Sequence, residues 1–363
     1  MMLQGHFIDG LLDNAFRDNT NIGYGLWKYF RGMTAPVFFT VSGFIFTYLL
    51  IRVPQTGFNN PRVKKGVKRG LELLFIGYLL RLNLGGILQG KLYDSFFLVD
   101  VLHCIGVSIL VIIGGYLLTY ARKQVLFPVV LVSITLLLFI LEPWYATTTF
   151  SSLPNAIANY LTRTNGSVFT IIPWVGYATM GAFVSIVFTK YKEHPQFYPR
   201  TIAVAITIGS LLIFTSSDLF VLISELTGST LFLKISMNNY LFIRLGDVFI
   251  AFAVFMLLRK WLKNPTFLKI GQSTLSIYVI HFIILYGSFT GVGLYRFFHH
   301  SLSPAIAIGG AILFMIVCSF TALLYEKHKA SIKKSSKDAF RFTWSQAEPF
   351  LKTSFSKAKM LFL

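Results

Sequence analysis

The sequence predicts an all-α fold: a polytopic integral membrane helix bundle of about ten transmembrane helices, the first of them truncated. Hydrophobic residues make up 55% of the 363 residues and charged residues only 13%, against roughly 25% charged residues in a typical soluble protein. Leucine-rich runs recur from end to end, and phenylalanine alone occurs 37 times. A soluble core could not hide this much apolar surface behind so few charges, so lipid is the expected solvent for most of the chain.

Ten apolar segments mark the predicted helices. A helix that crosses a hydrocarbon core about 30 Å thick needs about 20 residues at about 1.5 Å per residue. The first segment is too short for this, and we expect it to be the second half of a helix whose first half lies upstream. In chain order the segments are 1–12, 29–51, 68–89, 96–120, 125–141, 168–189, 201–222, 239–262, 267–289 and 303–325.

Basic residues are concentrated in every second gap between these segments and in the C-terminal part of the chain. The net charge is +19, and this placement is the one that the positive-inside rule requires of cytoplasmic loops. It predicts that both termini are cytoplasmic, in a plasma membrane or bacterial inner membrane, and it disfavours nucleic-acid binding. We expect one transmembrane domain over residues 1–326, followed by a basic amphipathic cytoplasmic tail over residues 327–363.

Cofactor and metal motifs find no support in the sequence. The two cysteines, Cys104 and Cys318, both lie inside apolar runs, so neither a disulfide framework nor a thiolate metal site is expected. The sequence contains no Walker, HExxH or CxxC motif, which argues against nucleotide hydrolysis and the common metal sites. We therefore expect no bound cofactor and no metal.

Ionisable side chains within the predicted helices are few, and each is a candidate for function because a charge inside a bilayer is costly. Most of them fall in the outer half of the membrane, which predicts one polar chamber that opens outward. Asp100 and His103 have the i, i+3 spacing that places both side chains on one helix face, and Arg244 and Asp247 repeat it. The candidates are His6, Asp9, Arg81, Asp100, His103, Arg244, Asp247 and His281.

His6 is the favoured catalytic candidate among them. It follows Gly5 in the first segment, and Asp9 comes one helical turn later. A carboxylate at that spacing can orient the imidazole as a general base. The sequence therefore predicts that His6 and Asp9 act together in proton transfer.

The remaining candidates each have a structural alternative. Arg244 and Asp247 can form a buried ion pair. Asp100 and His103 can form a hydrogen bond that packs two helices together. His281 lies alone in an apolar run, where a histidine is more often packed than catalytic. These alternatives stay open at this stage. All five residues remain candidates for lining the polar chamber, for stabilising an oxyanion or for binding a substrate that accepts a transferred group.

A basic stretch at a predicted cytoplasmic surface is the candidate donor site. Lys65, Lys68 and Arg69 run into the start of a helix, where cations can meet a phosphorylated ligand. An anionic donor such as an acyl-coenzyme A suits this position. The alternative is that these charges only fix the topology of the loop.

Several stretches resemble the transmembrane acyltransferase superfamily. Gly5-His6 and Pro-Val-Phe-Phe-Thr-Val-Ser-Gly-Phe at 36–44 resemble its opening. Val-Leu-His-Cys-Ile-Gly at 101–106 and Ile-Pro-Trp-Val-Gly-Tyr at 172–177 are similar to its heparan-α-glucosaminide N-acetyltransferase-like branch, with acyltransferase-3 proteins next nearest. The run Ile-Gly-Gln-Ser-Thr-Leu-Ser-Ile-Tyr-Val-Ile-His at 270–281 is similar to a late helix of both branches.

The resemblance implies transfer of an acyl group, most simply acetyl, from cytosolic acyl-coenzyme A to a hydroxyl or amine of a sugar or glycan on the extracytoplasmic side. It implies that His6 is the catalytic histidine and that Lys65 and Arg69 lie near the phosphates of the donor. The acceptor would attack the thioester directly, or would take the group from an acyl-histidine. The candidate donors to the oxyanion are Ser42, His103 and Arg244.

A transporter or flippase for a lipid-linked sugar or an anionic substrate is the alternative function. It would use Arg81 and Arg244 as counter-ions. Such proteins show repeated halves with matching broken helices, and the breaks at Pro36 and Pro173 do not pair. A purely structural subunit would leave the outer polar groups unexplained. The expected partners are acyl-coenzyme A, a sugar or glycan acceptor and the lipid bilayer, and formation of a homodimer stays open.

Overall fold

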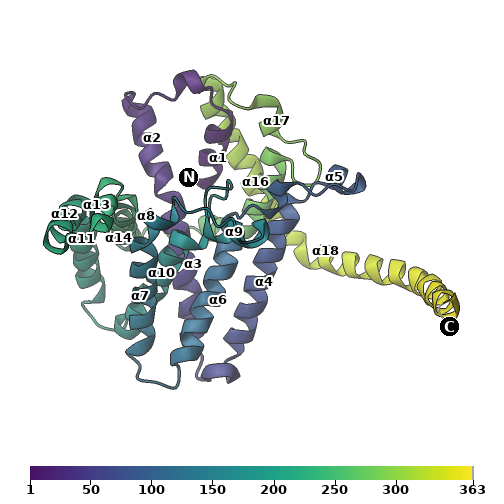
Figure 1. Ribbon diagram of the computed structural model, residues 1–363, viewed down its shortest axis with the longest axis horizontal. Helices are drawn as coiled ribbons and strands as arrows, with labels where there is room; N and C mark the ends of the chain where they lie inside the picture. Colours follow the sequence, from purple (N-terminus) through teal and green to yellow (C-terminus); the bar gives the residue numbers. More distant parts are fainter. Residues whose placement is uncertain (362–363) are drawn as a thin grey trace.

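The computed structural model describes the backbone of residues 1–361 and the side chains of residues 1–335 and 338. Over this range the chain folds as α-helices joined by short connections, which confirms the predicted all-α class. Figure 1 shows a bundle of long helices, with the short helices α5 and α17 at the upper right and α9 near the middle of the view. The last helix, α18, leaves the bundle and ends away from it.

Each predicted apolar segment overlaps a helix, but the segments 29–51, 68–89, 201–222 and 267–289 are each divided between two helices, and the last helix extends beyond the predicted residue 325. In chain order, the α-helices are α1 Met2–Leu11, α2 Ile22–Gly32, α3 Thr34–Ile51, α4 Pro61–Arg81, α5 Leu84–Leu88, α6 Val101–Thr119, α7 Leu126–Ile140, α8 Glu142–Tyr145, α9 Asn155–Leu161, α10 Ile171–Tyr191, α11 Phe197–Phe214, α12 Ser216–Thr227, α13 Thr230–Met237, α14 Tyr240–Leu258, α15 Pro265–Gln272, α16 Thr274–Tyr286, α17 Leu294–Phe298 and α18 Pro304–Leu361. Three 3₁₀ turns lie at Asn14–Phe16, Gly57–Asn59 and Asp94–Phe97.

Six of the described helical stretches are long and apolar enough to cross a membrane. The pair α15 and α16, bent by 66° at a short break, makes a seventh if it counts as one span. The helix α7 is apolar but shorter, and α4 has the length but carries basic residues in its first half. The chain is thus a multi-pass membrane protein, with six or seven spans shown.

Glycines allow the long helices to cross at backbone contact. A Cβ atom on Gly43 of α3 would lie 1.9 Å from the carbonyl oxygen of Ala178 of α10, and one on Gly181 of α10 would lie 1.9 Å from that of Thr40. Similar reciprocal glycine contacts join α4 to α6 and α11 to α14. Small residues at crossings are the usual way in which membrane helices approach closely, so these contacts fix how the main bundle is assembled.

The helix α4 positions one wall of the polar site. It begins at Pro61, earlier than the predicted residue 68, because the Asn60 side chain caps it by accepting from the Arg62 N–H at 2.8 Å and proline suits the first helical position. It ends at Arg81, since Leu82 is extended. The face that packs into the bundle repeats at three- and four-residue spacing: Val63, Gly66, Gly70, Leu73, Gly77 and Leu80.

Two large apolar clusters and a small third one build the interior of the described residues. The largest joins α3, α4, α6, α7, α10, α12, α13, α14 and α16. A separate cluster joins α1, α16 and α18 through buried side chains that include Leu3, Phe7, Leu11, Leu285 and Phe314. Because α16 contributes Tyr278 to the largest cluster and Leu285 to the second, it lies where the two clusters meet.

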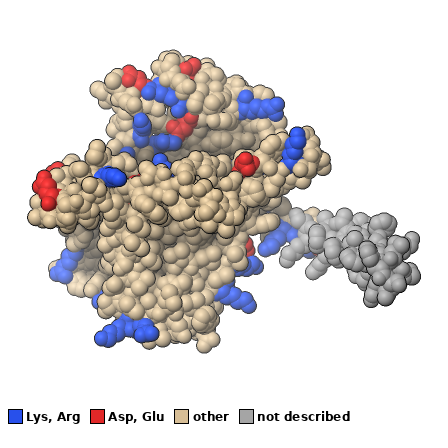
Figure 2. Space-filling model, in the orientation of Figure 1, with Lys and Arg blue, Asp and Glu red and all other residues tan. Residues whose placement is uncertain are grey.

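Charges are distributed unevenly along the bundle. Figure 2 shows Lys and Arg in both halves of the molecule, including the end where α4 and α7 begin, whereas most visible Asp and Glu lie in the opposite half.

The predicted boundary at residue 327 falls inside α18, which continues without interruption to Leu361. Most side chains of the predicted tail, 327–363, lie outside the described residues. Its amphipathic character therefore stays a prediction.

Candidate functional site

A cavity of about 570 Å³ lies among the ends of α1, α4 and α16 and the connections around them. Volumes of this size suit small-molecule sites. Its walls combine aromatic side chains with a set of polar ones that come from distant parts of the sequence. The polar lining residues are His6, Asp9, Arg31, Arg81, Asn83, Ser95, Asp100 and Ser288.

His6 enters the cavity from α1. Its Nδ1 lies 3.2 Å from the hydroxyl of Tyr286, and its ring stacks on His281 with centroids 5.2 Å apart. Among the described side chains no hydrogen-bond partner is found for Nε2. The ring is therefore held at one nitrogen and on one face, and the other nitrogen is left available to a ligand.

Asp9 also lines the cavity, but its carboxylate pairs with Arg31 of α2. Its backbone carbonyl accepts from the Arg17 guanidinium at 2.6 Å. Of the two groups near His6, it is Tyr286 that makes the hydrogen bond to the ring. The orienting contact predicted for Asp9 is thus made by a residue that sequence spacing did not single out.

Arg81 and Asp100 form the second charged pair of the cavity. Two hydrogen bonds of 2.6 and 2.7 Å join the guanidinium to the two carboxylate oxygens, and Arg81 also donates to the Ser95 carbonyl at 2.9 Å. This fork geometry is the strong form of an arginine–carboxylate contact. It ties the end of α4 to the connection that leads into α6.

Asp100 was predicted inside a helix beside His103, and the structure corrects this placement. Asp100 is the N-cap of α6, and its backbone N–H donates to His103 Nδ1 at 3.1 Å. His103 is fully buried against Tyr78, with ring centroids 4.4 Å apart. It closes a capping box behind the cavity and does not line it.

Arg244 and Asp247 lie outside the cavity lining. Arg244 donates to one carboxylate oxygen at 2.8 Å, and Tyr29 donates to the other at 2.5 Å. The guanidinium also lies over the Tyr29 ring, 4.5 Å from its centroid. This arrangement is a buried pair whose hydrogen bonds are made within the protein.

Ser42 and His281, two further predicted candidates, both lie outside the cavity lining. The Ser42 hydroxyl donates to the Phe38 carbonyl of its own helix at 2.7 Å, and Ser42 does not line the cavity. His281 is fully buried behind His6, and neither of its ring nitrogens has a partner among the described residues. Of the ionisable residues predicted as candidates, the structure brings His6, Asp9, Arg81 and Asp100 to the cavity.

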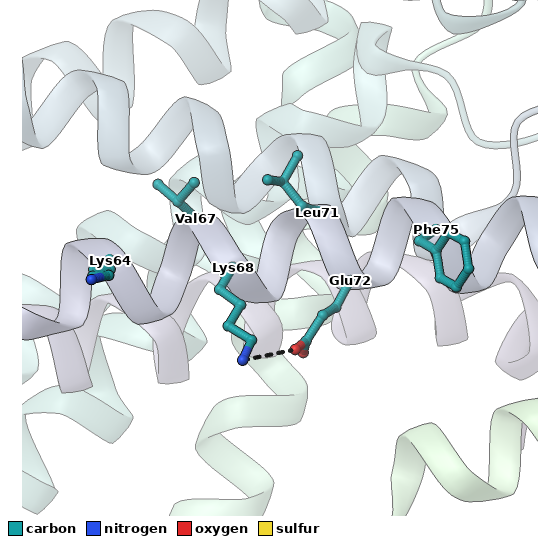
Figure 3. A pocket seen from close by; sticks show the side chains of 6 residues that line it. All are labelled: Lys64, Val67, Lys68, Leu71, Glu72 and Phe75. Atoms are coloured by element: carbon teal, nitrogen blue, oxygen red, sulfur yellow. Dashed lines mark ion pairs between the residues drawn. The ribbon is translucent and has the colours of Figure 1, made fainter. Parts of the chain in front are cut away.

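The predicted donor site lies elsewhere on α4. A shallow pocket of about 640 Å³ follows the outer face of this helix and includes Lys68 but not Lys65 or Arg69. Figure 3 shows its side chains in a row, with Lys68 turned toward Glu72, 4.0 Å away. Lys68 and Arg69 both remain substantially exposed, so their positive charge can meet a ligand.

A buried polar group lies in the connection between α7 and α10. Glu142 is almost fully buried and lies 3.6 Å from the Arg163 guanidinium. Burial raises the pKa of the Glu142 carboxyl, and Arg163 opposes this rise. Burial likewise raises the pKa of Tyr145, whose hydroxyl donates to Thr170. These contacts hold the connection together and do not line the cavity.

Sequence reasoning missed several residues of the cavity. Arg31 was counted as a loop charge, and Tyr286 and Ser288 are neutral side chains near the end of an apolar segment. Only the position of Tyr286 and Ser288 along the chain, within two helical turns of His281, could have indicated these two residues. In the described residues, no group of three or more His, Cys, Asp or Glu side chains could hold a metal ion.

The chain was compared with known families, curated proteins and solved structures. Residues 1–219 match the family described as heparan-alpha-glucosaminide N-acetyltransferase, catalytic. No curated protein and no solved structure matches the chain. The matched range includes α1 with His6, α4 with Arg81 and the start of α6 with Asp100, whereas α16 lies beyond it.

Proposed function

Because the chain belongs to the family described as heparan-alpha-glucosaminide N-acetyltransferase, catalytic, we propose that it moves an acetyl group from cytosolic acetyl-coenzyme A to an amine or hydroxyl of a sugar or glycan. Membership makes the chain a membrane acyltransferase, in line with the resemblance seen in its sequence, and it disfavours the transporter alternative. The donor, the acceptor and the side on which each binds belong to the proposal.

The observation that carries the proposal is the environment of His6. Its imidazole faces a cavity large enough for a sugar, and its Nδ1 lies within hydrogen-bond distance of Tyr286. A ring held in this way can present Nε2 to an acceptor that binds in the cavity. Two arginine–carboxylate pairs, one from Asp9 and one from Asp100, keep the charge of the lining balanced.

The proposed chemistry begins with proton transfer to His6. As the acceptor N–H or O–H gives its proton to Nε2, its lone pair attacks the thioester carbonyl carbon. The tetrahedral intermediate collapses when the carbon–sulfur bond breaks, and the departing thiolate takes the proton from His6. Asp9 supports this step indirectly, through Arg31 and the end of α1. An acyl-histidine route would use the same nitrogen as nucleophile.

The cavity also limits which oxyanion donors are available. Arg81 lines it, although its guanidinium already binds Asp100. Of the residues predicted for this role, Ser42, His103 and Arg244 lie outside the lining. We therefore propose that the oxyanion forms nearest Arg81. The role assigned to His281 is to pack against the ring of His6.

The donor would reach the cavity from the other end of α4. Lys65, Lys68 and Arg69 remain the proposed contacts for its phosphates, and Lys65 lies about 24 Å from Arg81 along the helix axis at 1.5 Å per residue. The two ends of one helix would then serve the two substrates. This places donor and acceptor on opposite faces of the membrane.

Topology follows from the same proposal. Adding α1, α4 and α7 to the seven apolar spans gives about ten membrane segments, with both termini and the basic surface cytoplasmic. A homodimer is compatible with the proposal but is not required by it, because every residue named here comes from one chain.

The test is acetyl transfer by purified protein in liposomes of known orientation. Labelled acetyl-coenzyme A is supplied at the basic face and glucosamine at the opposite face, and the product is identified by mass spectrometry. We expect acetylated sugar only with this arrangement. Binding of neither substrate, together with passage of a lipid-linked sugar across the same liposomes, would overturn the enzyme proposal in favour of a transporter.

A further inference from the structure

One wall of the cavity is built from two interrupted helices. The helix α4 ends at Arg81 and the chain resumes as α5 at Leu84, while α16 ends at Tyr286 and α17 begins at Leu294. The two breaks pair with each other, because Leu84 N–H donates to the Phe289 carbonyl at 2.9 Å and Phe289 N–H donates to the Leu82 carbonyl at 3.0 Å. Non-helical backbone at membrane depth is tolerated where it lines a cavity.

The second break is held in an unusual conformation. Gly287 has φ +70°, and a Cβ atom there would lie 2.4 Å from the backbone nitrogen of Gly293, so only glycine fits. Phe289 has φ +72°, a region that bulky residues rarely adopt. Its two hydrogen bonds to the α4 break stabilise this conformation. Local strain of this kind is found mostly where the backbone serves a site.

Ser288 lies between these two residues and lines the cavity. Its side chain is only 8% exposed, and its hydroxyl has no hydrogen-bond partner among the described residues. A buried hydroxyl without a partner is destabilising, because the hydrogen bonds that it made to water are not replaced. The strained segment thus holds a polar group at the cavity wall that nothing in the described protein satisfies.

Asn83 of the other break lines the same wall. Its Oδ1 accepts from the Gly86 N–H at 3.1 Å, which turns the amide so that its Nδ2 group is the part left for a ligand. Ser288 can both donate and accept, and Asn83 can donate. Aromatic surface from Phe282 and Phe289 lies beside them.

We propose that Ser288 and Asn83 form the acceptor subsite and bind a ring hydroxyl of the sugar, while His6 faces the group that is acetylated. This inference rests on the proposed function and deepens it, since it assigns the acceptor to residues of the paired helix breaks. Ser288 lies outside the range matched by the family.

The test combines one substitution with one change in the substrate. Ser288→Ala is expected to lower kcat/KM for glucosamine about tenfold through the acceptor KM, with the KM for acetyl-coenzyme A and the melting temperature unchanged. A set of monodeoxyglucosamines is then assayed with both proteins. One deoxy analogue should lose about tenfold with the wild type and nothing further with Ser288→Ala, because the hydroxyl and its partner are removed together.

Ser185 of α10 provides a matched control. It is also a buried serine whose hydroxyl has no partner among the described residues, but it does not line the cavity. Ser185→Ala should leave both KM values at those of the wild type. Equal acceptor KM values for Ser288→Ala and the wild type, or additive losses with every deoxy analogue, would overturn the subsite.

Failure of the proposed function gives a different result. If the wild type transfers no acetyl group, glucosamine binding is measured directly by calorimetry on the wild type and on Ser288→Ala. Binding that weakens in the variant would retain the subsite without the enzyme reaction. Absence of binding to the wild type would overturn both.

Discussion

Two arginine–carboxylate pairs of this bundle have the same chemistry and different surroundings. Arg81 of α4 binds Asp100 at the start of α6 across two elements, and both side chains line the cavity. Arg244 and Asp247 lie one turn apart on α14, and Tyr29 binds the second oxygen of Asp247. The first pair can meet a ligand, whereas the second is closed by its own neighbours.

The difference shows what sequence spacing can and cannot establish. An i, i+3 spacing correctly placed Arg244 and Asp247 on one face, but such a local pair can be complete without a substrate. Asp100 has the same spacing to His103 and bonds it through its backbone N–H, yet its carboxylate binds an arginine nineteen residues earlier. Access to a cavity, and not the presence of charge in a helix, separates the candidate site from a structural contact.

The largest expected effect is on stability. Asp247→Ala leaves the Arg244 guanidinium buried without its carboxylate, and removal of one partner of a buried pair costs about 3–5 kcal/mol. We expect a much lower melting temperature in detergent, with kcat/KM per folded molecule at the wild-type value. Asp247→Ala combined with Arg244→Met should recover most of the stability. A loss of transfer activity at unchanged melting temperature would place this pair in the site after all.

The next effect is on activity. Asp100→Asn weakens the fork to Arg81 and frees the connection that leads into α6, and displacement of a positioned group by about 1 Å can cost about 100-fold in rate. We expect kcat/KM for acetyl transfer to fall by about that factor. Glu142→Gln changes a matched carboxylate that pairs with an arginine outside the cavity, and it should leave kcat/KM unchanged. Equal losses in the two variants would remove the distinction between them.

Two tyrosines make the comparison sharper. Tyr286→Phe removes the hydrogen bond to His6 and should lower kcat about tenfold without a change in melting temperature. Tyr29→Phe removes the hydrogen bond to Asp247 and should lower stability by about 1–3 kcal/mol without a change in kcat. The measurements are steady-state kinetics and thermal unfolding on both proteins. An exchange of the two outcomes would reverse the assignment of site and structural pair.

The pH dependence of stability should come partly from Glu142. Burial raises the pKa of this carboxyl in the folded state, so the folded protein binds its proton more tightly than the unfolded chain does. Its contribution to stability is therefore present below the unfolded pKa and is lost as pH rises through the raised, folded pKa. Thermal unfolding of Glu142→Gln across this range should show a smaller fall with pH than the wild type. Parallel curves would contradict the shift.

The smallest effect concerns the donor site. Lys68 is mostly exposed and lies 4.0 Å from Glu72, a contact worth about 0–1 kcal/mol. If its charge meets the donor phosphates, Lys68→Ala should raise the KM for acetyl-coenzyme A about threefold at low salt, with stability unchanged. Lys91→Ala, a matched substitution in the connection before α6, should leave this KM unchanged. An unchanged KM for acetyl-coenzyme A in Lys68→Ala would mean that this lysine only helps to fix the topology of the loop in the membrane.

The helix bundle was largely predictable because membrane segments can be recognised in the sequence as long apolar runs. Each predicted segment overlaps a helix in the structure, and capping at Asn60 explains why α4 begins earlier than predicted. The interruptions at Leu82 and Gly287 were not predicted, since both lie within apolar runs. Their cause is a pairing between distant segments, which no local pattern contains.

The site was predictable where it depends on rare residues and missed where it depends on common ones. His6, Asp9 and Asp100 were identified because ionisable groups in a bilayer are unusual, and they do line one cavity. The partner of Asp9 was not predicted, because Arg31 belongs to a different helix, α2, and comes close to Asp9 only in the folded structure. Tyr286 and Ser288 resemble ordinary residues of an apolar helix, and only the fold shows that they face the same cavity.

The most direct test of the account replaces His6 itself. Acetyl transfer from labelled acetyl-coenzyme A to glucosamine is measured for His6→Ala and for the control His194→Ala, an exposed histidine in the connection between α10 and α11. The account predicts loss of at least about 100-fold for His6→Ala, with partial recovery on addition of imidazole, and full activity for the control. Transfer by His6→Ala at the wild-type rate would contradict the claim that this cavity is the catalytic site.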